Sequence, residues 1–396
     1  MSKKQKRKIN GIFLGIIAFA LGAIVMSFIL KHYNENKNVL HNDPIDTKIS
    51  QYSDIYIPQS AMETNLRFKQ IAFKTAPPKD SIFSSQIAAV TKAINVLTNK
   101  QNTEKENGTW IWTPIMSMTP QYMENIISGA KKNGINAIYL SIDSYLDIFV
   151  LPQSEEKQKQ EKIFGEKLEN FIALADSMDI AVDAEGGWRN WAEDGNSYKP
   201  FAVVNYAKNF NATRKNKFRG FQYDVEPYLL DSYEKNSEQI LKNFVALVGQ
   251  TASFLENSDL RFSVVVPDFY DEKDGMTPKF SYNGKKSYTF KHLLNILDKK
   301  QNSSIIIMSY RAFAEGFDGS IEISTNEMKT AKKGSYQTKI IIAQETGEVL
   351  PAYLTFHNTS KNRLFEEIGK INTAFDPYSN FNGIAIHYAN AFLALK

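Results

Sequence analysis

The stretch "FRGFQYDVEPYLL", Phe218–Leu230, has the pattern of a buried β-strand, yet it carries two carboxylates, Asp224 and Glu226. Residues two apart in a strand share a face, so Gln222, Asp224 and Glu226 are predicted to point to the same side. An isolated buried charge costs about several kcal/mol unless it is paired or solvated. The stretch therefore predicts a strand whose last inward-facing residues reach solvent at a functional site.

Similar strand-like runs alternate with helical patterns over residues 108–396. The eight runs are "TWIWTP" (109–114), "INAIYLSID" (135–143), "DIAVDAEGGW" (179–188), "GFQYDVEPY" (220–228), "RFSVVVPDFY" (261–270), "SSIIIMSYRAF" (303–313), "TKIIIAQETG" (338–347) and "FNGIAIHYANAF" (381–392). Helical patterns are predicted at 119–133, 155–178, 200–210, 232–256, 288–300, 323–332 and 361–374. Apolar strands separated by helices indicate parallel pairing, and eight such units favour a closed (β/α)8 TIM barrel in the α/β class. An open doubly wound sheet is the alternative, but no glycine-rich phosphate loop follows the first run.

Polar and aromatic residues gather where the predicted strands end, and barrel active sites form at those carboxyl ends. The candidate substrate-binding residues are Asp183, Glu185, Trp188, Tyr228, Asp268, Tyr270, Arg311, His387, Tyr388 and Trp112. The candidate catalytic residues are Glu226, Asp224, Glu345 and Tyr310. The structural alternative for a carboxylate is an ion pair with Arg219 or Arg311, and for Trp112 it is core packing. The opposite strand ends show no comparable set of polar residues.

Neighbouring carboxylates repel, so one of a pair retains its proton to a higher pH, as a general acid requires. Glu226 is the candidate for that acid. Cleavage of a glycosidic bond uses a protonated carboxyl to assist the leaving oxygen and a second group to attack or stabilise the anomeric carbon. Aromatic faces at the same strand ends would suit sugar rings.

The chain resembles the family 18 glycoside hydrolases, chitinase-like (β/α)8 barrels with D-G-x-D-x-D-x-E on strand four, S-x-G-G on strand three and M-x-Y-D on strand six. The matching residues are Gly220, Asp224 and Glu226 in "RGFQYDVE", Gly186 and Gly187 in "AEGGW", and Met308 and Tyr310 in "MSYR". The resemblance implies that Glu226 donates the proton. It also implies that Asp224 and Tyr310 hold a substrate acetamido group that attacks the anomeric carbon.

A second resemblance is to the clan of retaining barrel glycosidases, which place an acid/base Glu at the end of strand four and a nucleophile Glu at the end of strand seven. Here "VEP" supplies Glu226 and "AQETGE" supplies Glu345. The two resemblances agree on Glu226 and differ on the nucleophile, which is a substrate oxygen in one and Glu345 in the other. A supporting role beside Arg311 is the alternative for Glu345.

Other classes of function have less support in the sequence. The five histidines are scattered, the chain has no cysteine and no G-x-S-x-G, and neither a metal nor an organic cofactor is implied. A non-catalytic carbohydrate-binding barrel for polysaccharide assembly or attachment is the alternative function, because Arg219, Gln222 and Arg311 replace acids of the family 18 motifs.

The N-terminus predicts a membrane anchor. Residues 1–10 form a basic tail that would stay cytoplasmic, and "GIFLGIIAFALGAIVMSFIL" (11–30) is uncharged and long enough to span a bilayer as a helix. A cleaved signal peptide is the alternative. Residues 31–107 are predicted to form a tether and an extension, and the domain at 108–396 would lie outside the cytoplasm.

The net charge of +4 is concentrated in the tail, which argues against a nucleic-acid partner. The expected partners are a cell-envelope or exported polysaccharide and the membrane.

Overall fold

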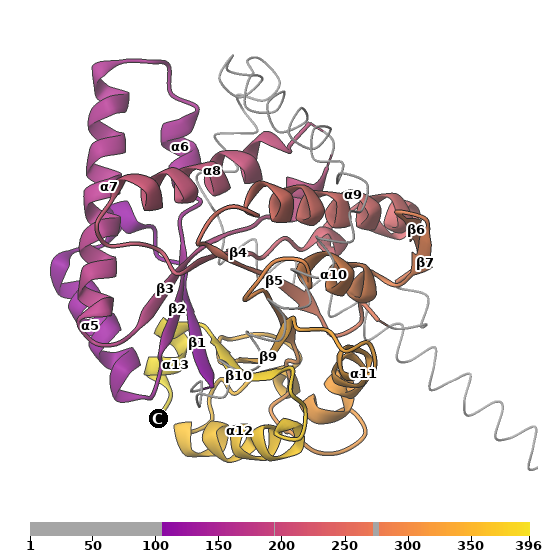
Figure 1. Ribbon diagram of the computed structural model, residues 1–396. Coiled ribbons are helices and arrows are strands. Elements are labelled where there is room, and N and C mark those ends of the chain that lie inside the picture. Colours follow the sequence, from indigo (N-terminus) through magenta and orange to yellow (C-terminus); the bar gives the residue numbers. More distant parts are fainter. Residues whose placement is uncertain (1–104, 194, 272–276) are drawn as a thin grey trace, which may run out of the picture.

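A computed structural model describes residues 105–193, 195–271 and 277–396, and these residues build a closed barrel of eight parallel strands in the order β1-β10-β9-β8-β5-β4-β3-β2 (Figure 1). The barrel strands are β1 (Glu106–Ile111), β2 (Ala137–Ser141), β3 (Ala181–Gly186), β4 (Gly220–Tyr223), β5 (Arg261–Pro267), β8 (Ser304–Met308), β9 (Lys339–Glu345) and β10 (Phe381–His387). Each one overlaps one of the eight predicted runs, so the predicted (β/α)8 barrel is confirmed.

Helices surround the strands in Figure 1. They are α5 (Pro120–Lys132), α6 (Tyr145–Phe149), α7 (Glu155–Asp176), α8 (Tyr198–Thr213), α9 (Tyr233–Phe254), α10 (Thr289–Leu297), α11 (Ser320–Lys333), α12 (Lys361–Phe375) and α13 (Ala389–Ala394). The seven predicted helices are all present. The sequence patterns did not predict α6, α13 or the antiparallel hairpin of β6 (Phe280–Tyr282) and β7 (Lys285–Ser287).

Local signals explain where the longer helices begin. The Ser154 hydroxyl accepts a hydrogen bond from the Lys157 N–H at the start of α7, and Glu155 and Glu156 occupy its first turn. Thr119 caps α5 in the same way, ahead of a proline at the first helical position. Such caps satisfy backbone N–H groups that have no partner within the helix.

Barrel closure depends on the pairing of the first strand with the last. Glu106 of β1 lies opposite Gly383 of β10, where the register shifts between Phe381 and Gly383. Gly383 has φ +128°, and a side chain there would lie 2.0 Å from the Glu106 carbonyl oxygen. Only glycine therefore permits this approach of the two backbones.

The alternation of side chains along the strands creates two apolar regions. Phe221, Tyr223 and Phe262 point outward and pack beneath the helices. Trp110, Tyr139, Val265, Ile306, Met308, Ile341, Ala343 and Ala385 fill the inside of the barrel. Residues further along the same inward rows, such as Glu345 and His387, reach the carboxyl end of the strands.

The barrel begins at Glu106, inside the segment that was predicted as an extension. The predicted tail at 1–10, the predicted anchor at 11–30 and nearly all of the predicted tether lie outside the described residues. Within residues 105–193, 195–271 and 277–396, no helix is long and apolar enough to cross a membrane.

Candidate active site

The end of β4 differs from the regular strand that the sequence predicts. The strand stops at Tyr223, the Asp224 N–H still donates to the Gly186 carbonyl at 3.2 Å, and the chain then turns at Glu226 (φ −112°, ψ 69°) into a short 3-10 helix, η3 (Pro227–Leu229). Regular strand alternation therefore ends at Tyr223. Gln222, on the predicted common face, points into the barrel and accepts from the Trp110 indole N–H at 2.7 Å.

Glu226 is buried at this turn, with 2% of its surface exposed. The Tyr228 hydroxyl donates to Glu226 Oε1 at 2.5 Å. Pro227 follows Glu226 directly and begins η3, and this turn brings the Tyr228 hydroxyl back to the carboxylate. Tyr228 also packs against the apolar residues inside the barrel. Glu226 is thus held at the barrel interior by its own turn.

Two glycines allow β3 and β4 to end in close contact. A side chain at Gly187 would lie 2.0 Å from the backbone oxygen of Asp224, and one at Gly186 would lie 2.7 Å from Asp143 Oδ1. The Gly187 N–H donates to Asp143 Oδ2 at 3.3 Å. The "GG" pair therefore lets Asp143 and Asp224 lie on either side of one backbone segment.

Glu345 ends β9 and is 1% exposed. Its Oε1 accepts from the Gly347 N–H at 2.6 Å, and its Oε2 lies 2.7 Å from His387 Nδ1. His387 Nε2 in turn accepts from the Trp112 indole N–H at 3.0 Å. Three predicted site residues, at the carboxyl ends of the neighbouring strands β1, β10 and β9, are therefore joined in one chain of hydrogen bonds.

Aromatic rings surround His387. Tyr310 stacks on its imidazole with ring centres 6.0 Å apart, and Trp110, Trp112 and Tyr388 approach its edges at 5.7, 5.7 and 5.2 Å. Burial raises the pKa of the Tyr388 hydroxyl, and the negative charge of Glu345 raises it further. Tyr388 therefore stays a neutral phenol beside the carboxylate at physiological pH.

Arg311 is committed to acidic neighbours rather than to Glu345. Its guanidinium donates to both carboxylate oxygens of Asp318 at 2.9 and 2.8 Å and lies 3.6 Å from Asp268. It also lies over the ring of Tyr353 at 5.8 Å. Arg311 and Asp268, both predicted to bind substrate, thus pair with each other, and the predicted alternative role of Glu345 beside Arg311 has no support.

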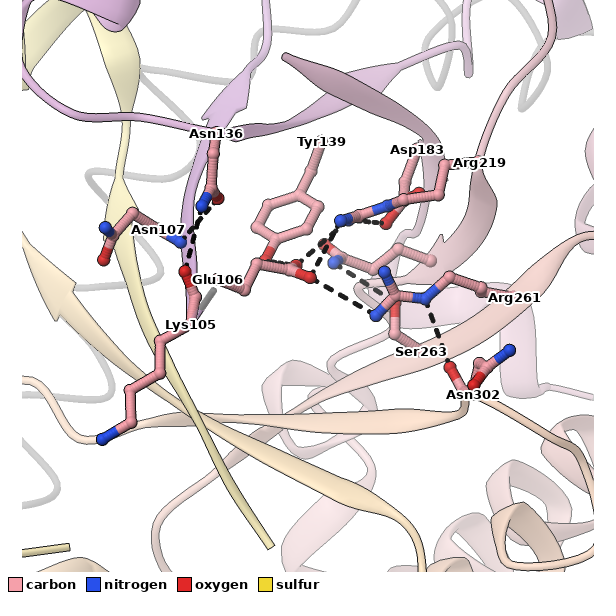
Figure 2. Close-up of polar contacts among 11 residues, drawn as sticks. Lys105, Glu106, Asn107, Asn136, Tyr139, Asp183, Arg219, Arg261, Ser263 and Asn302 are labelled. Atoms are coloured by element: carbon pink, nitrogen blue, oxygen red, sulfur yellow. Dashed lines mark hydrogen bonds and ion pairs between the residues drawn. The ribbon is translucent and has the colours of Figure 1, made fainter. Parts of the chain in front are cut away.

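Asp183 does not lie at the carboxyl end of the strands, where the sequence predicts it. It faces the barrel interior, but it lies at the amino end of the strands, where Arg219 Nε donates to its Oδ1 at 2.8 Å and Arg219 Nη2 to its Oδ2 at 2.6 Å. Figure 2 shows Arg219 and Arg261 converging on Glu106 in the same cluster. The prediction that Asp183 lies at the carboxyl end is wrong. The opposite end, which was expected to show no comparable set of polar residues, holds Glu106, Asp183, Arg219 and Arg261.

Tyr270, predicted to bind substrate, does not face the barrel interior. Its ring is 1% exposed and packs outside the strands against Phe244 and Phe269. Glu185 and Trp188 remain near the end of β3. Glu185 is fully buried inside the barrel, and Trp188 is half-buried beneath the Arg189 guanidinium at 5.6 Å.

Two features of the site could not be derived from the sequence. The Trp112–His387 hydrogen bond joins positions separated by 275 residues. Asp143, whose carboxylate accepts from the Gly187 N–H, was not among the predicted site residues. In the described part of the chain, no group of three or more His, Asp or Glu side chains could hold a metal ion.

No protein-family model matches this sequence, and no curated protein matches it either. Similar solved structures include the endo-1,4-beta-D-mannanase of Thermotoga petrophila RKU-1, with 10% identity and a TM-score of 0.48 over 72% of this chain and 88% of that chain. Others are a family 1 glucosidase from Thermotoga maritima (11%, 0.44, 72% and 88%) and a GH18 chitinase from Pseudoalteromonas aurantia (13%, 0.42, 72% and 93%). These neighbours are glycoside hydrolases, but at such identity the likeness concerns the fold and says nothing about the substrate of this chain.

Proposed function

We propose that the protein is a glycoside hydrolase that cleaves a polysaccharide with retention of anomeric configuration, with Glu345 as nucleophile and Glu226 as general acid and base. The observation that carries the proposal is the pair of buried carboxylates at the ends of β9 and β4. Each is oriented by a neighbouring donor, Glu345 by Gly347 and Glu226 by Tyr228. Only β8 and β5 separate these two strands in the barrel.

The reaction follows from the two roles. Glu345 attacks the anomeric carbon as the bond from that carbon to the leaving oxygen breaks, and Glu226 gives its proton to the departing oxygen. A water then gives a proton to the Glu226 carboxylate and attacks the same carbon, which releases Glu345. The Tyr228 hydroxyl donates to Glu226 Oε1 and so stabilises the carboxylate between the two steps.

The alternative, attack by a substrate acetamido oxygen, has less support from the site. It requires a tyrosine on the sixth strand to bind the acetamido group, but the Tyr310 ring stacks on His387. The neighbouring position of that motif is Arg311, which is paired with Asp318 and Asp268. Glu345, by contrast, is oriented by two contacts on the inner side of the barrel.

The proposal places the barrel outside the cytoplasm, tethered through residues 11–30. This placement is supported by the uncharged, apolar character of residues 11–30 and by the basic residues that precede them. A tethered enzyme would act on a polysaccharide of the cell envelope or one exported through it.

Trapping and chemical rescue test the proposal. Full-length protein in detergent is incubated with dinitrophenyl β-glycosides of glucose, mannose and N-acetylglucosamine, and then with the glucose and mannose compounds in which fluorine replaces the 2-hydroxyl group. The expected result is a covalent sugar on the peptide that contains Glu345. For Glu226→Ala, azide is expected to restore turnover of a dinitrophenyl glycoside and to yield the glycosyl azide of retained configuration.

The matched control is Glu348→Gln, because Glu348 is exposed and lies three residues beyond Glu345. It should be labelled and turn over like the wild type. If only the N-acetylglucosamine substrate is cleaved and Glu345→Gln keeps full activity, substrate-assisted attack replaces this mechanism. If the wild type binds oligosaccharides but cleaves none, the binding-only barrel replaces the enzyme.

A further inference from the structure

The hydrogen bonds from Trp112 to His387 and from His387 to Glu345 carry an inference that rests on the proposed function. We propose that Trp112 is a positioning residue, whose indole N–H holds His387 in the tautomer that carries its proton on Nδ1 and so directs that proton at Glu345. Trp112 was predicted to contact substrate. In the structure, its indole N–H instead donates to His387.

The tautomer follows from the chemistry of the three groups. An indole N–H can only donate, so His387 Nε2, at 3.0 Å from Trp112 Nε1, must present its lone pair. A neutral imidazole with a bare Nε2 has its proton on Nδ1. Nδ1 lies 2.7 Å from Glu345 Oε2, so that proton is donated to the carboxylate.

The surroundings keep these groups in place. β1, β10 and β9 are consecutive in the barrel, and His387 is directly opposite Glu345 in the parallel register. Trp112 follows the last residue of β1. Glu345 Oε1 is occupied by the Gly347 N–H, so the carboxylate cannot rotate to another donor without losing that hydrogen bond.

The other tautomer would act against catalysis. With the proton on Nε2, the Nδ1 lone pair of His387 would face the lone pairs of Glu345 Oε2, and the carboxylate would have to turn away or take up a proton. Either change removes the attacking group from its place. The indole N–H of Trp112 therefore adds, from the Nε2 side, to the preference for a protonated Nδ1 that Glu345 imposes from the other side.

Nitrogen NMR of the imidazoles reads the tautomer directly. Full-length protein in detergent is labelled with nitrogen-15 histidine, and the His387 signals are identified by their loss in His387→Asn. In the wild type, Nδ1 is expected to carry the proton and Nε2 to be bare. In Trp112→Phe, the population with a protonated Nε2 should rise, whereas Trp191→Phe, a buried tryptophan remote from His387, should leave the His387 signals unchanged.

Activity measurements add a second reading. Trp112→Phe should lower kcat about 10-fold on the dinitrophenyl glycoside that the wild type cleaves, with KM within about twofold, because the loss is that of one hydrogen bond acting on the nucleophile. His387→Asn keeps an N–H donor near the position of Nδ1, so it should be about 10-fold more active than His387→Leu.

The outcomes separate the two proposals. A wild-type His387 with its proton on Nε2, or a Trp112→Phe variant with an unchanged tautomer, overturns the role of Trp112 whether or not the protein cleaves sugars. Absence of turnover with the expected tautomer overturns the catalytic proposal alone. If Trp112→Phe does not fold, benzothienylalanine at position 112 keeps the ring shape, replaces the N–H by sulfur and is expected to give the same NMR change.

Discussion

The two ends of the barrel interior hold buried carboxylates in different ways. At the amino end, Glu106 and Asp183 are bonded to Arg219, and Glu106 is also bonded to Arg261 (Figure 2). At the carboxyl end, Glu345 is bonded to an imidazole and a backbone N–H, and within the described residues it forms no ion pair with lysine or arginine.

This difference distinguishes carboxylates that stabilise the barrel from a carboxylate that can take part in a reaction. At the amino end, two guanidinium groups form ion pairs with two carboxylates. Each of these carboxylates is neutralised by its partners and is not available to react with a substrate. Neutral donors orient Glu345 without cancelling its charge, so that charge remains available to a developing positive charge on a sugar. Variants at the two ends should therefore lose different properties, stability at the amino end and activity at the carboxyl end.

The largest expected effect is on activity. Glu345→Gln should lower kcat about 10,000-fold, because an amide cannot form the glycosyl intermediate. Turnover of a dinitrophenyl glycoside measures it, and urea unfolding should show little change in stability. Glu106→Gln is the matched variant at the other end, and its activity per folded molecule should equal that of the wild type. A similar loss in both variants would contradict the division.

The next effect is on stability. Arg219→Met should lower the free energy of unfolding by about 3–5 kcal/mol at neutral pH, because it leaves two buried carboxylates without their main partner. Urea denaturation of the full-length protein in detergent measures the loss. Arg214→Met removes a half-exposed pair with Glu169 and should cost at most about 1 kcal/mol. Equal losses would show that the amino-end cluster is no more than surface electrostatics.

The amino-end cluster should also make stability depend on acid. Burial raises the pKa of Glu106, but the charges of Arg219 and Arg261, with hydrogen bonds from Tyr139 and Arg219, outweigh burial and hold that pKa below its ordinary value of 4.5. A pKa lowered by folding contributes stability above the ordinary value and loses it as the pH falls through the folded-state value.

Unfolding free energies measured below pH 4.5 should therefore fall more steeply in the wild type than in Glu106→Gln. Glu124→Gln, on an exposed helical face, is the control and should keep the wild-type slope. Equal slopes in the wild type and Glu106→Gln would assign the acid sensitivity to other carboxylates.

The smallest effect compares two tyrosines whose ring centres lie 6.2 Å apart. Tyr270→Phe should leave kcat within about twofold and raise stability by up to about 1 kcal/mol, because within the described chain its buried hydroxyl has no hydrogen-bond partner. Tyr228→Phe should lower kcat about 10-fold, because it removes the donor to Glu226. Kinetics and urea unfolding of both variants measure the contrast, and a reversed ranking would restore Tyr270 to the site.

Much of the barrel could be predicted from the sequence because its units are local. A run such as "TKIIIAQETG" (338–347) has the apolar content of a strand buried on both faces, and the helices between runs require parallel pairing. The same alternation places Glu345 and His387 on the inward rows. Glu226 was found for a different reason, since a buried carboxylate after an apolar strand is costly unless it is paired or solvated, which points to a functional site.

Asp183 shows where this reasoning fails. Alternation correctly places its side chain inside the barrel, but it does not say how far along the axis the residue lies. That height depends on the stagger between strands, which sets Asp183 level with Gly220, the first residue of β4 and the neighbour of Arg219. The prediction for Tyr270 is wrong because its strand ends at Pro267, so the two-residue alternation of side chains no longer applies at position 270.

The sequence by itself determined the number and order of the strand and helix units, the inward or outward face of most strand residues, and the presence of acids at the ends of the fourth and seventh strands. These properties depend on the spacing of apolar residues over a few turns of chain. The tertiary structure decided which charges are neutralised and which are only oriented, because those contacts join positions as distant as Trp112 and His387. A hydrogen bond needs its two atoms within about 3 Å, and only the closed barrel with its stagger brings them that close.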